Sequence, residues 1–280
     1  MQLTVLVDNN TLIDRYFLGE PAVSYFIDDA GTRILFDVGY SDAFLINAQK
    51  MAIDLCTVDF VVLSHGHLDH TWGLDPLIRL YLESKFERFE SKKPTLVAHP
   101  SAFQTKLLEG VGQIGSLVTE RRAANYFTLH QSREPVWLTE RLVYLGEIPR
   151  RNEFEAQTPI GTVVTAEKEA EADYSLDDSA LAYQSSQGLV VITACAHAGI
   201  CNTIEYAREV CGEDRVADVI GGFHLLNPPE RQLKRTLAYF ASRQPAAVHA
   251  CHCTDLHSKL ALAQVAMLQE VGVGLRLCYE

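Results

Sequence analysis

The feature that most constrains this chain is a dense group of metal-ligating side chains directly after an apolar segment. Residues 60–63, Phe-Val-Val-Leu, have the character of a buried strand, which ends abruptly at Ser64. The next six positions hold His65, His67, Asp69 and His70. Imidazoles and a carboxylate crowded at a strand end repel one another or stay unpaired unless a cation binds them. The sequence therefore predicts a metal site at this strand end.

The spacing within this group predicts two neighbouring metal positions. Gly66 lets the backbone turn tightly, so that His65 and His67 converge on one point. Asp69 and His70 come slightly later and are expected to face a second point nearby. Nitrogen-rich ligation with a carboxylate suits zinc, with manganese or iron as alternatives. We therefore expect two divalent metal ions as cofactors, with zinc as the first choice.

Composition limits the partners and the compartment of the chain. Its 280 residues are 48% hydrophobic and 21% charged, an ordinary balance for a well-filled core. The net charge of −12 argues against nucleic acid and against anionic membranes as partners. No apolar run reaches the roughly 18 residues of a membrane span, and the N-terminus lacks the pattern of a signal peptide. The seven cysteines, an odd number, fit reduced thiols, so we expect a cytoplasmic protein.

The order of predicted elements favours an α/β sandwich made of two similar halves packed sheet on sheet. A hairpin is predicted over residues 22–40, with its turn at Asp28–Gly31. Other predicted elements include strands at 3–7, 94–99 and 246–252 and helices at 41–53, 75–89, 100–111 and 258–271. No linker-like tract divides the chain. We therefore expect one domain, 1–280, with insertions around 80–175.

Two later segments repeat the pattern of an apolar strand followed by histidine. In VVITACAHAG the strand leads to His197 and then Gly199, which favours a third ligand for the first metal over a buried histidine bonded to backbone. The segment AAVHACHCTD offers His249, Cys251, His252 and Cys253. Strand alternation sends His249 and Cys251 to one face and leaves His252 near the end. Without a Cys-x-x-Cys pairing, the cysteines stay outside the predicted ligand set.

The pattern His-x-His-x-Asp-His after an apolar strand resembles the signature of the metallo-β-lactamase superfamily. Other segments that match follow in order: LFDVG with Asp37, GEIPR (146–150), DDSAL (177–181), CAHAGICNTI (195–204), GGFHL (221–225) and HCT (252–254). This series is similar to a subgroup of metal-dependent hydrolases related to the archaeal dihydropterin-ribofuranosylaminobenzene-phosphate synthase. The resemblance covers almost the whole chain. It implies a four-layer αββα sandwich with the metals at one edge between the two sheets.

The resemblance also implies how the ligands divide. His65, His67 and His197 would hold the first metal, and Asp69, His70 and His252 the second. Asp37 would support the metal loop. Asp178 would bind metal or fix a ligand histidine, although a helix cap explains an acidic residue there equally well.

Several residues are candidates for catalysis and substrate binding. His224, after Gly221 and Gly222, is a candidate metal ligand, general acid or substrate contact, and we expect a direct role in the active site. Arg150 and Arg151 are candidate clamps for a phosphate or carboxylate, with a solvated charge pair as the alternative. Gly222 and Thr254 complete the predicted substrate-binding residues.

These predictions together indicate a hydrolase. Two metals about 3.5–4 Å apart would hold a bridging water as hydroxide, and Asp69 would both ligate metal and orient that water. We expect a dinuclear metal-dependent hydrolase acting on a small anionic phosphoester, such as a phosphodiester. The alternatives are a transferase of the synthase type named above, or a non-catalytic, ligand-sensing member of the fold.

Overall fold

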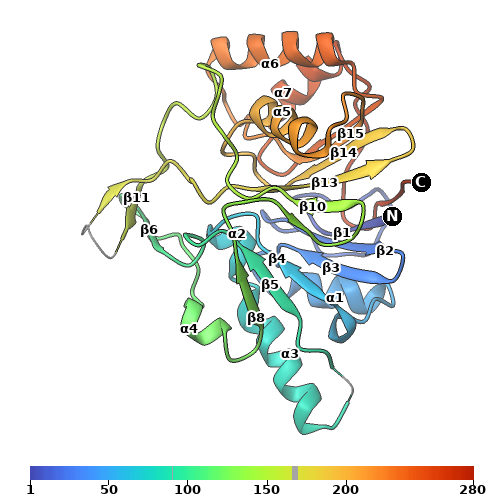
Figure 1. Cartoon of the computed structure of the whole chain (residues 1–280), viewed down its shortest axis with the longest axis vertical. Coiled ribbons are helices and arrows are strands. Elements are labelled where there is room, and N and C mark those ends of the chain that lie inside the picture. The colour runs from blue at the N-terminus through green and yellow to red at the C-terminus, as the bar shows by residue number, and fades with distance from the viewer. Residues whose placement is uncertain (90, 166–169) are drawn as a thin grey trace.

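Two large β-sheets lie face to face, with helices on both outer sides (Figure 1). The computed structural model describes residues 1–89, 91–165 and 170–280. One apolar cluster fills the space between the sheets, and two others fill the spaces between each sheet and its helices. The expected four-layer αββα sandwich is therefore confirmed.

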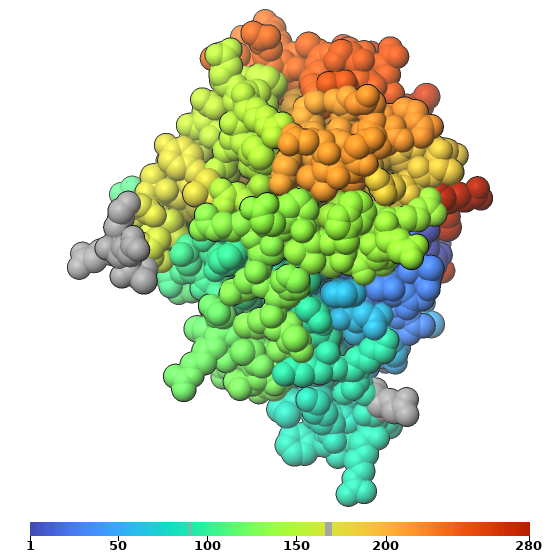
Figure 2. All heavy atoms as spheres, viewed as in Figure 1, coloured from blue at the N-terminus to red at the C-terminus, as the bar shows by residue number. Residues whose placement is uncertain are grey.

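The first sheet has the strand order β17-β1-β2-β3-β4-β5-β8. Its strands are β1 (Gln2–Val7), β2 (Ser24–Asp29), β3 (Thr32–Phe36), β4 (Phe60–Val62), β5 (Thr95–Ala98), β8 (Thr128–Gln131) and β17 (Arg276–Cys278). β2 and β3 form the predicted hairpin, whose turn is closed by the Gly31 amide donating to Asp28 Oδ1 at 2.9 Å. Helices α1 (Ala43–Lys50) and α3 (Leu74–Phe86) cover the outer face. The C-terminal end of α3 projects from the body of the molecule (Figure 2).

The second sheet has the order β16-β15-β14-β13-β10-β9. Its strands are β9 (Val136–Trp137), β10 (Leu142–Tyr144), β13 (Ala180–Ser185), β14 (Gly188–Thr193), β15 (Val216–Gly222) and β16 (Ala247–Cys251), and helices α5 (Ile200–Cys211), α6 (Glu230–Arg243) and α7 (Leu256–Leu262) cover it. β14, β15 and β16 run parallel. Their carboxyl ends therefore meet at one edge, and His197, His224 and His252 all lie just beyond those ends.

Two predicted helices are wrong. Residues 100–111 contain strand β6 (Thr105–Leu108), which pairs with β7 (Gly112–Gln113) across a turn that has Gly110 and Gly112 at positive φ. Helical periodicity cannot anticipate this pairing, because the buried side chain on β6 is Lys106, held by distant carboxylates. The helix predicted over 258–271 ends at Leu262 in α7, and residues 267–269 hydrogen-bond to Val248 instead.

The charged middle segment builds a small third sheet. Its order is β12-β11-β6-β7, with β11 (Thr162–Val164) and β12 (Glu171–Ala172). The same segment also supplies strands to both large sheets, so it is only partly separate from the sandwich. The single domain with insertions therefore stays a prediction. Among the described residues, no helix combines the length and the apolarity that a membrane crossing needs.

A substitution in the apolar layer between the two sheets tests the sandwich. Leu181 on β13 is fully buried there, whereas Leu260 on α7 is 60% exposed. Leu181→Ala is expected to lower the free energy of unfolding by about 2–5 kcal/mol, because it removes buried apolar atoms and leaves a cavity. Leu260→Ala, the matched control, should change it by less than about 0.5 kcal/mol. Urea titration measures both, and equal losses would contradict the placement of Leu181.

Candidate metal centre

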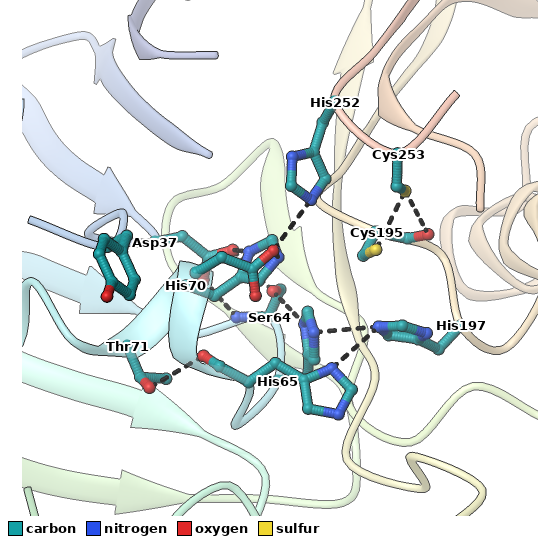
Figure 3. Close-up of polar contacts among 12 residues, drawn as sticks. Asp37, Ser64, His65, His70, Thr71, Cys195, His197, His252 and Cys253 are labelled. Carbon is teal, nitrogen blue, oxygen red and sulfur yellow. Dashed lines mark hydrogen bonds and ion pairs between the residues drawn. The ribbon is translucent and has the colours of Figure 1, made fainter. Parts of the chain in front are cut away.

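The candidate site lies where the loop after β4 meets the loops after β14 and β16, at one edge between the two sheets (Figure 3). The strand β4 ends at Val62, and the short helix α2 (Leu68–Thr71) begins six residues later. This metal loop, residues 64–70, carries four of the six predicted ligands. The second sheet brings His197 and His252 to the same place from the opposite side.

The structure brings the three side chains of the first predicted ligand group together. His197 Nε2 lies 3.1 Å from His65 Nε2 and 3.2 Å from His67 Nδ1, and all three side chains are buried. Burial lowers the pKa of His65 and of His197 well below the usual range, and it lowers the pKa of His67 to about 4. The three rings are therefore neutral at neutral pH.

The facing nitrogens of these three neutral imidazoles are better suited to binding a cation than to hydrogen bonding with one another. His197 Nε2 faces two other ring nitrogens but offers either one proton or one lone pair, so it can make only one well-directed hydrogen bond to them. The opposite nitrogens, His67 Nε2 and His197 Nδ1, are buried without a hydrogen-bond partner. A divalent cation between the three facing nitrogens would use all three lone pairs, which is the usual ligation of zinc by histidine.

The second predicted group is held together by charge. Asp69 Oδ2 lies 3.4 Å from His70 Nε2 and 3.3 Å from His252 Nε2. Burial raises the pKa of Asp69. The charges and hydrogen bonds of His70 and His252 together outweigh this effect and bring the pKa well below its usual range. Burial lowers the pKa of His70, but Asp69 and Asp37 raise it well above its ordinary value. The proton on His70 thus occupies a place where two carboxylates favour positive charge, and a metal cation suits that place.

Asp37 fixes the metal loop from beneath. Its carboxylate accepts the Ser64 amide at 2.7 Å and the Ser64 hydroxyl at 2.6 Å. It also accepts His70 Nδ1–H at 2.7 Å, which leaves His70 Nε2 to face Asp69 and His252. Asp37 is fully buried and has a φ of 56°, a conformation that costs energy for a residue other than glycine. This is the position of a residue that orients a ligand histidine.

The adjacent Asp177 and Asp178 each hold one ligand loop. Asp178 Oδ2 accepts the Ala198 amide at 2.8 Å, and burial raises the pKa of Asp178 to about 7. Asp177 Oδ2 accepts the Gly66 amide at 2.7 Å, in the middle of the metal loop. The sequence pattern predicts a role for Asp178 only, whereas Asp177 holds the metal loop directly. Gly66 itself has no room for a side chain, because a Cβ would lie 2.3 Å from the Ala102 carbonyl oxygen.

Lys106 is a second residue that sequence reasoning missed. Its ammonium group is buried and lies 2.8 Å from both Asp173 Oδ2 and Asp177 Oδ1. The same insertion contacts the metal loop through its backbone, since Ile114 O accepts the Leu68 amide at 2.8 Å. No signal in the sequence identifies Lys106, because it lies in residues 100–111, for which the sequence predicts a helix.

His224 lies beside the first group rather than within it. Its ring centroid is 4.5 Å from that of His197, and its Nδ1 is 3.8 Å from Cys195 Sγ. Although burial lowers the pKa of His224, a hydrogen bond and the charge of Cys253 raise it above the ordinary value. The same contacts from Cys195 and His224 lower the pKa of the Cys253 thiol against the effect of burial. His224 therefore carries a proton more readily than His65, His67 and His197 do.

A cavity of about 420 Å³ opens onto this site. The residues lining it include His197, His224, Phe154, Tyr174, Leu226 and Arg231. The other predicted substrate residues are used elsewhere: Arg150 Nη2 donates to Ser175 O at 2.8 Å, and Arg151 pairs with Glu209 at 2.5 Å. Thr254 Oγ1 accepts the Phe223 amide at 3.0 Å, and Gly222 packs against Cys253. Their roles in substrate binding stay predictions.

Comparison with known proteins agrees with this geometry. A family model described as the metallo-β-lactamase superfamily matches residues 18–85. The crystal structure of Tm1679, a metal-dependent hydrolase of the β-lactamase superfamily, superimposes with a TM-score of 0.83 at 27% identity over 100% of both chains. The chain is therefore similar to proteins of the metallo-β-lactamase superfamily, both in its metal-loop region and in its fold. Members of this superfamily bind divalent metals, and the residues gathered here fit such ions.

Two curated relatives come from the archaeon Methanocaldococcus jannaschii. One is 7,8-dihydropterin-6-methyl-4-(β-D-ribofuranosyl)-aminobenzene-5'-phosphate synthase, 27% identical over 237 residues, which are 81% of this chain and 77% of the relative. The other is the uncharacterized protein MJ0448, 28% identical over 267 residues, which are 94% of both chains. The similarity to this part of the superfamily therefore extends well beyond the metal loop.

Asp37→Asn tests the support of the metal loop. The amide keeps the shape of the side chain but removes the negative charge that holds the His70 Nδ1 proton, so metal affinity is expected to fall about 10–100-fold. Competition with a chromophoric chelator measures this affinity. Asp42→Asn is the control, since Asp42 is exposed and its side chain makes no capping bond to α1. Unchanged affinity in Asp37→Asn would contradict the assigned role.

Lys106→Met tests the buried charge cluster. It leaves Asp173 and Asp177 buried without their cation, so the free energy of unfolding is expected to fall by about 3–5 kcal/mol at neutral pH. The control Lys92→Met removes an ion pair whose ammonium side chain is 53% exposed, and it should cost about 0–1 kcal/mol.

The pH dependence of this difference is a further check. Although burial raises the pKa of Asp177, Lys106 lowers it below the ordinary value. A lowered folded pKa adds stability above the unfolded value of about 4, and this stability is lost as the pH falls through the folded pKa. The gap between wild type and Lys106→Met in urea titrations should therefore shrink below about pH 4. A gap that widens there would contradict the ion-pair assignment.

Proposed function

We propose that this protein is a dinuclear metal-dependent hydrolase that activates water for attack on a small anionic phosphoester. The observation that carries the proposal is the adjacency of the two ligand groups beside a cavity that His197 of the first group lines. The rings of His65 and His70, one from each group, have centroids 4.2 Å apart. Two cations held by these groups would therefore be close enough to act on one water and one substrate.

The residues of the candidate centre have different roles in the proposed hydrolysis. His65, His67 and His197 would hold one divalent cation and Asp69, His70 and His252 another, and such ions would supply Lewis acidity and lower the pKa of a bound water. Asp69 is ionised, because its pKa is lowered, and its partly exposed carboxylate can accept a hydrogen bond from the attacking water and orient it. His65 and His197 stay neutral and take no part in proton transfer.

His224 is the proposed proton donor. It lines the cavity beside His197, and its raised pKa keeps the imidazole protonated to higher pH than in a free histidine. A protonated imidazole at the cavity wall can give its proton to the oxygen of the leaving group. Asp178 holds the Ala198 amide and so keeps the loop of His197 in place.

The size and charge of the cavity support a small anionic substrate. A volume of about 420 Å³ is in the range of small-molecule sites, and Arg231 on its wall is paired with Glu153, with its side chain 60% exposed. A guanidinium held only by an exposed carboxylate can exchange that partner for a phosphate. The net charge of −12 makes such a local cation important, because the rest of the surface repels anions.

A transferase is the second candidate, and one observation favours it. The archaeal synthase, whose name describes a ribofuranosyl-aminobenzene 5'-phosphate product, is 27% identical to 81% of this chain. In a transferase on this scaffold, an acceptor other than water would occupy the cavity and the same residues would manage the protons. A phosphate-bearing substrate is common to both candidates.

Turnover of bis(p-nitrophenyl) phosphate by the purified, metal-loaded protein tests the hydrolase. We expect release of p-nitrophenol, with kcat reduced about 10²–10⁴-fold in Asp69→Asn at a metal content that is measured in parallel. Asp75→Asn is the control, since Asp75 forms only a half-exposed pair with Arg79. Full metal content without turnover would contradict the hydrolase and leave the transferase as the proposal.

A further inference from the structure

Two thiols and an imidazole form a third cluster of ligand atoms beside the two groups described above. Cys195 Sγ lies 3.0 Å from Cys253 Sγ and 3.8 Å from His224 Nδ1. The ligand atoms of all three residues lie within 4.8 Å of one another. Figure 3 shows the sulfur atoms of Cys195 and Cys253 facing each other. Neither cysteine has a place in the proposed hydrolytic mechanism.

The cluster is built from three separate loops that are fixed to one another. Cys195 follows β14, His224 follows β15 and Cys253 follows β16, so the parallel order of these strands brings the three side chains together. The loops of His224 and Cys253 are also joined directly, because Phe223 N–H donates to Thr254 Oγ1 at 3.0 Å and Leu225 bridges Thr254. The ligand atoms are therefore positioned before any ion arrives.

Two backbone contacts fix the sulfur of Cys253, and in one of them the Cys253 thiol donates to the Cys195 carbonyl oxygen at 3.4 Å. The backbone N–H of His224 points at Cys253 Sγ with a distance of 3.2 Å. Space for the sulfur is made by Gly222, where a Cβ would lie 2.6 Å from Cys253 Sγ. Cys195 is 5% exposed and Cys253 is half-buried. These contacts hold the sulfur of Cys253 beside that of Cys195 before an ion binds.

We infer that Cys195, Cys253 and His224 form a third metal site, selective for a thiophilic cation such as Zn²⁺, Cd²⁺ or Cu⁺. Two sulfurs and one nitrogen are the ligand type that such ions prefer over Mg²⁺ or Mn²⁺. With metal–sulfur bonds of about 2.3 Å, one ion can bridge two sulfurs at this spacing after a small outward shift. The remaining thiol protons leave to solvent when the ion binds.

The open side of this site faces the cavity. His224 lines the cavity, whereas Cys195 is covered by protein, so a ligand can reach the ion from the cavity side. Three protein ligands with one free position are the arrangement that leaves room for a water or a substrate atom. The inference goes beyond the proposed hydrolase, which uses neither cysteine. With an ion bound at His224 Nδ1, only the Nε2–H of that imidazole is left as a proton donor.

A competing assignment uses one of the same thiols. Cys195 Sγ also lies within 4.8 Å of the ligand atoms of His70 and His252, so it can serve as an extra ligand of the second group. The 3.0 Å contact with Cys253 favours the paired-thiol site, because a ligand shared with the second group leaves Cys253 and its backbone donor without a function. The two assignments differ in whether Cys253 is a metal ligand.

Cobalt substitution of the full chain tests the inference. Purified protein, Cys195→Ser, Cys253→Ser and the control Cys278→Ser, whose thiol is exposed, are loaded with Co²⁺ after reduction. Elemental analysis gives metal per chain, and the near-ultraviolet thiolate-to-cobalt charge-transfer band reports sulfur ligation. We expect each of the two site variants to lose the band and about one metal equivalent, whereas the control keeps both. Circular dichroism verifies that each variant is folded.

His67→Ala separates this site from the first group. It should lose metal from the histidine site while the charge-transfer band persists, because neither sulfur lies in that group. Three results would overturn the inference: no band in the reduced wild-type protein, a band lost in Cys195→Ser but kept in Cys253→Ser, or a disulfide that re-forms between the two cysteines and blocks cobalt. None of these results bears on phosphodiester turnover, so failure here is distinct from failure of the proposed hydrolase.

Discussion

The contact on which the site depends is the carboxylate of Asp37 with the metal loop. One buried side chain accepts the backbone amide and the hydroxyl of Ser64 and the Nδ1–H of His70. It therefore sets both the start of the loop and the direction of a ligand nitrogen at its end. The loop between these two points has little freedom left, and its histidines are presented to the second sheet as one unit.

The two loops of the second sheet that carry His197 and His252 are each held by a carboxylate that accepts a backbone N–H. Asp178 holds the Ala198 amide beside His197, and Asp8 holds the His252 amide at 3.0 Å. Asp177 reaches across the sandwich to Gly66. Each ligand histidine thus has an acidic residue near it that binds an N–H group. Several carboxylates of this acidic protein are therefore buried and hold the loops of the candidate metal centre in place.

Much of this arrangement follows from sequence periodicity and motif spacing. The hairpin of β2 and β3 and the strand before the histidines were predictable, because each depends on local patterns. The edge where the predicted ligands gather was implied by the family resemblance instead. The misplaced elements depended on distant partners. Residues 100–111 have helical spacing, yet β6 pairs with β7 and β11 and buries Lys106 against Asp173 and Asp177. Pairing over such separations leaves no periodic trace in one chain.

The long sequence separation of these contacts has a consequence for the order of assembly. Gly66 and Asp177 are 111 positions apart, and His65 and His197 are 132 apart. Contacts of this kind form late, because closing a long loop costs entropy before any contact compensates it. On the ribosome, the metal loop emerges long before the carboxylate and the imidazole that complete it. Ion capture at full affinity therefore has to follow the docking of the two halves.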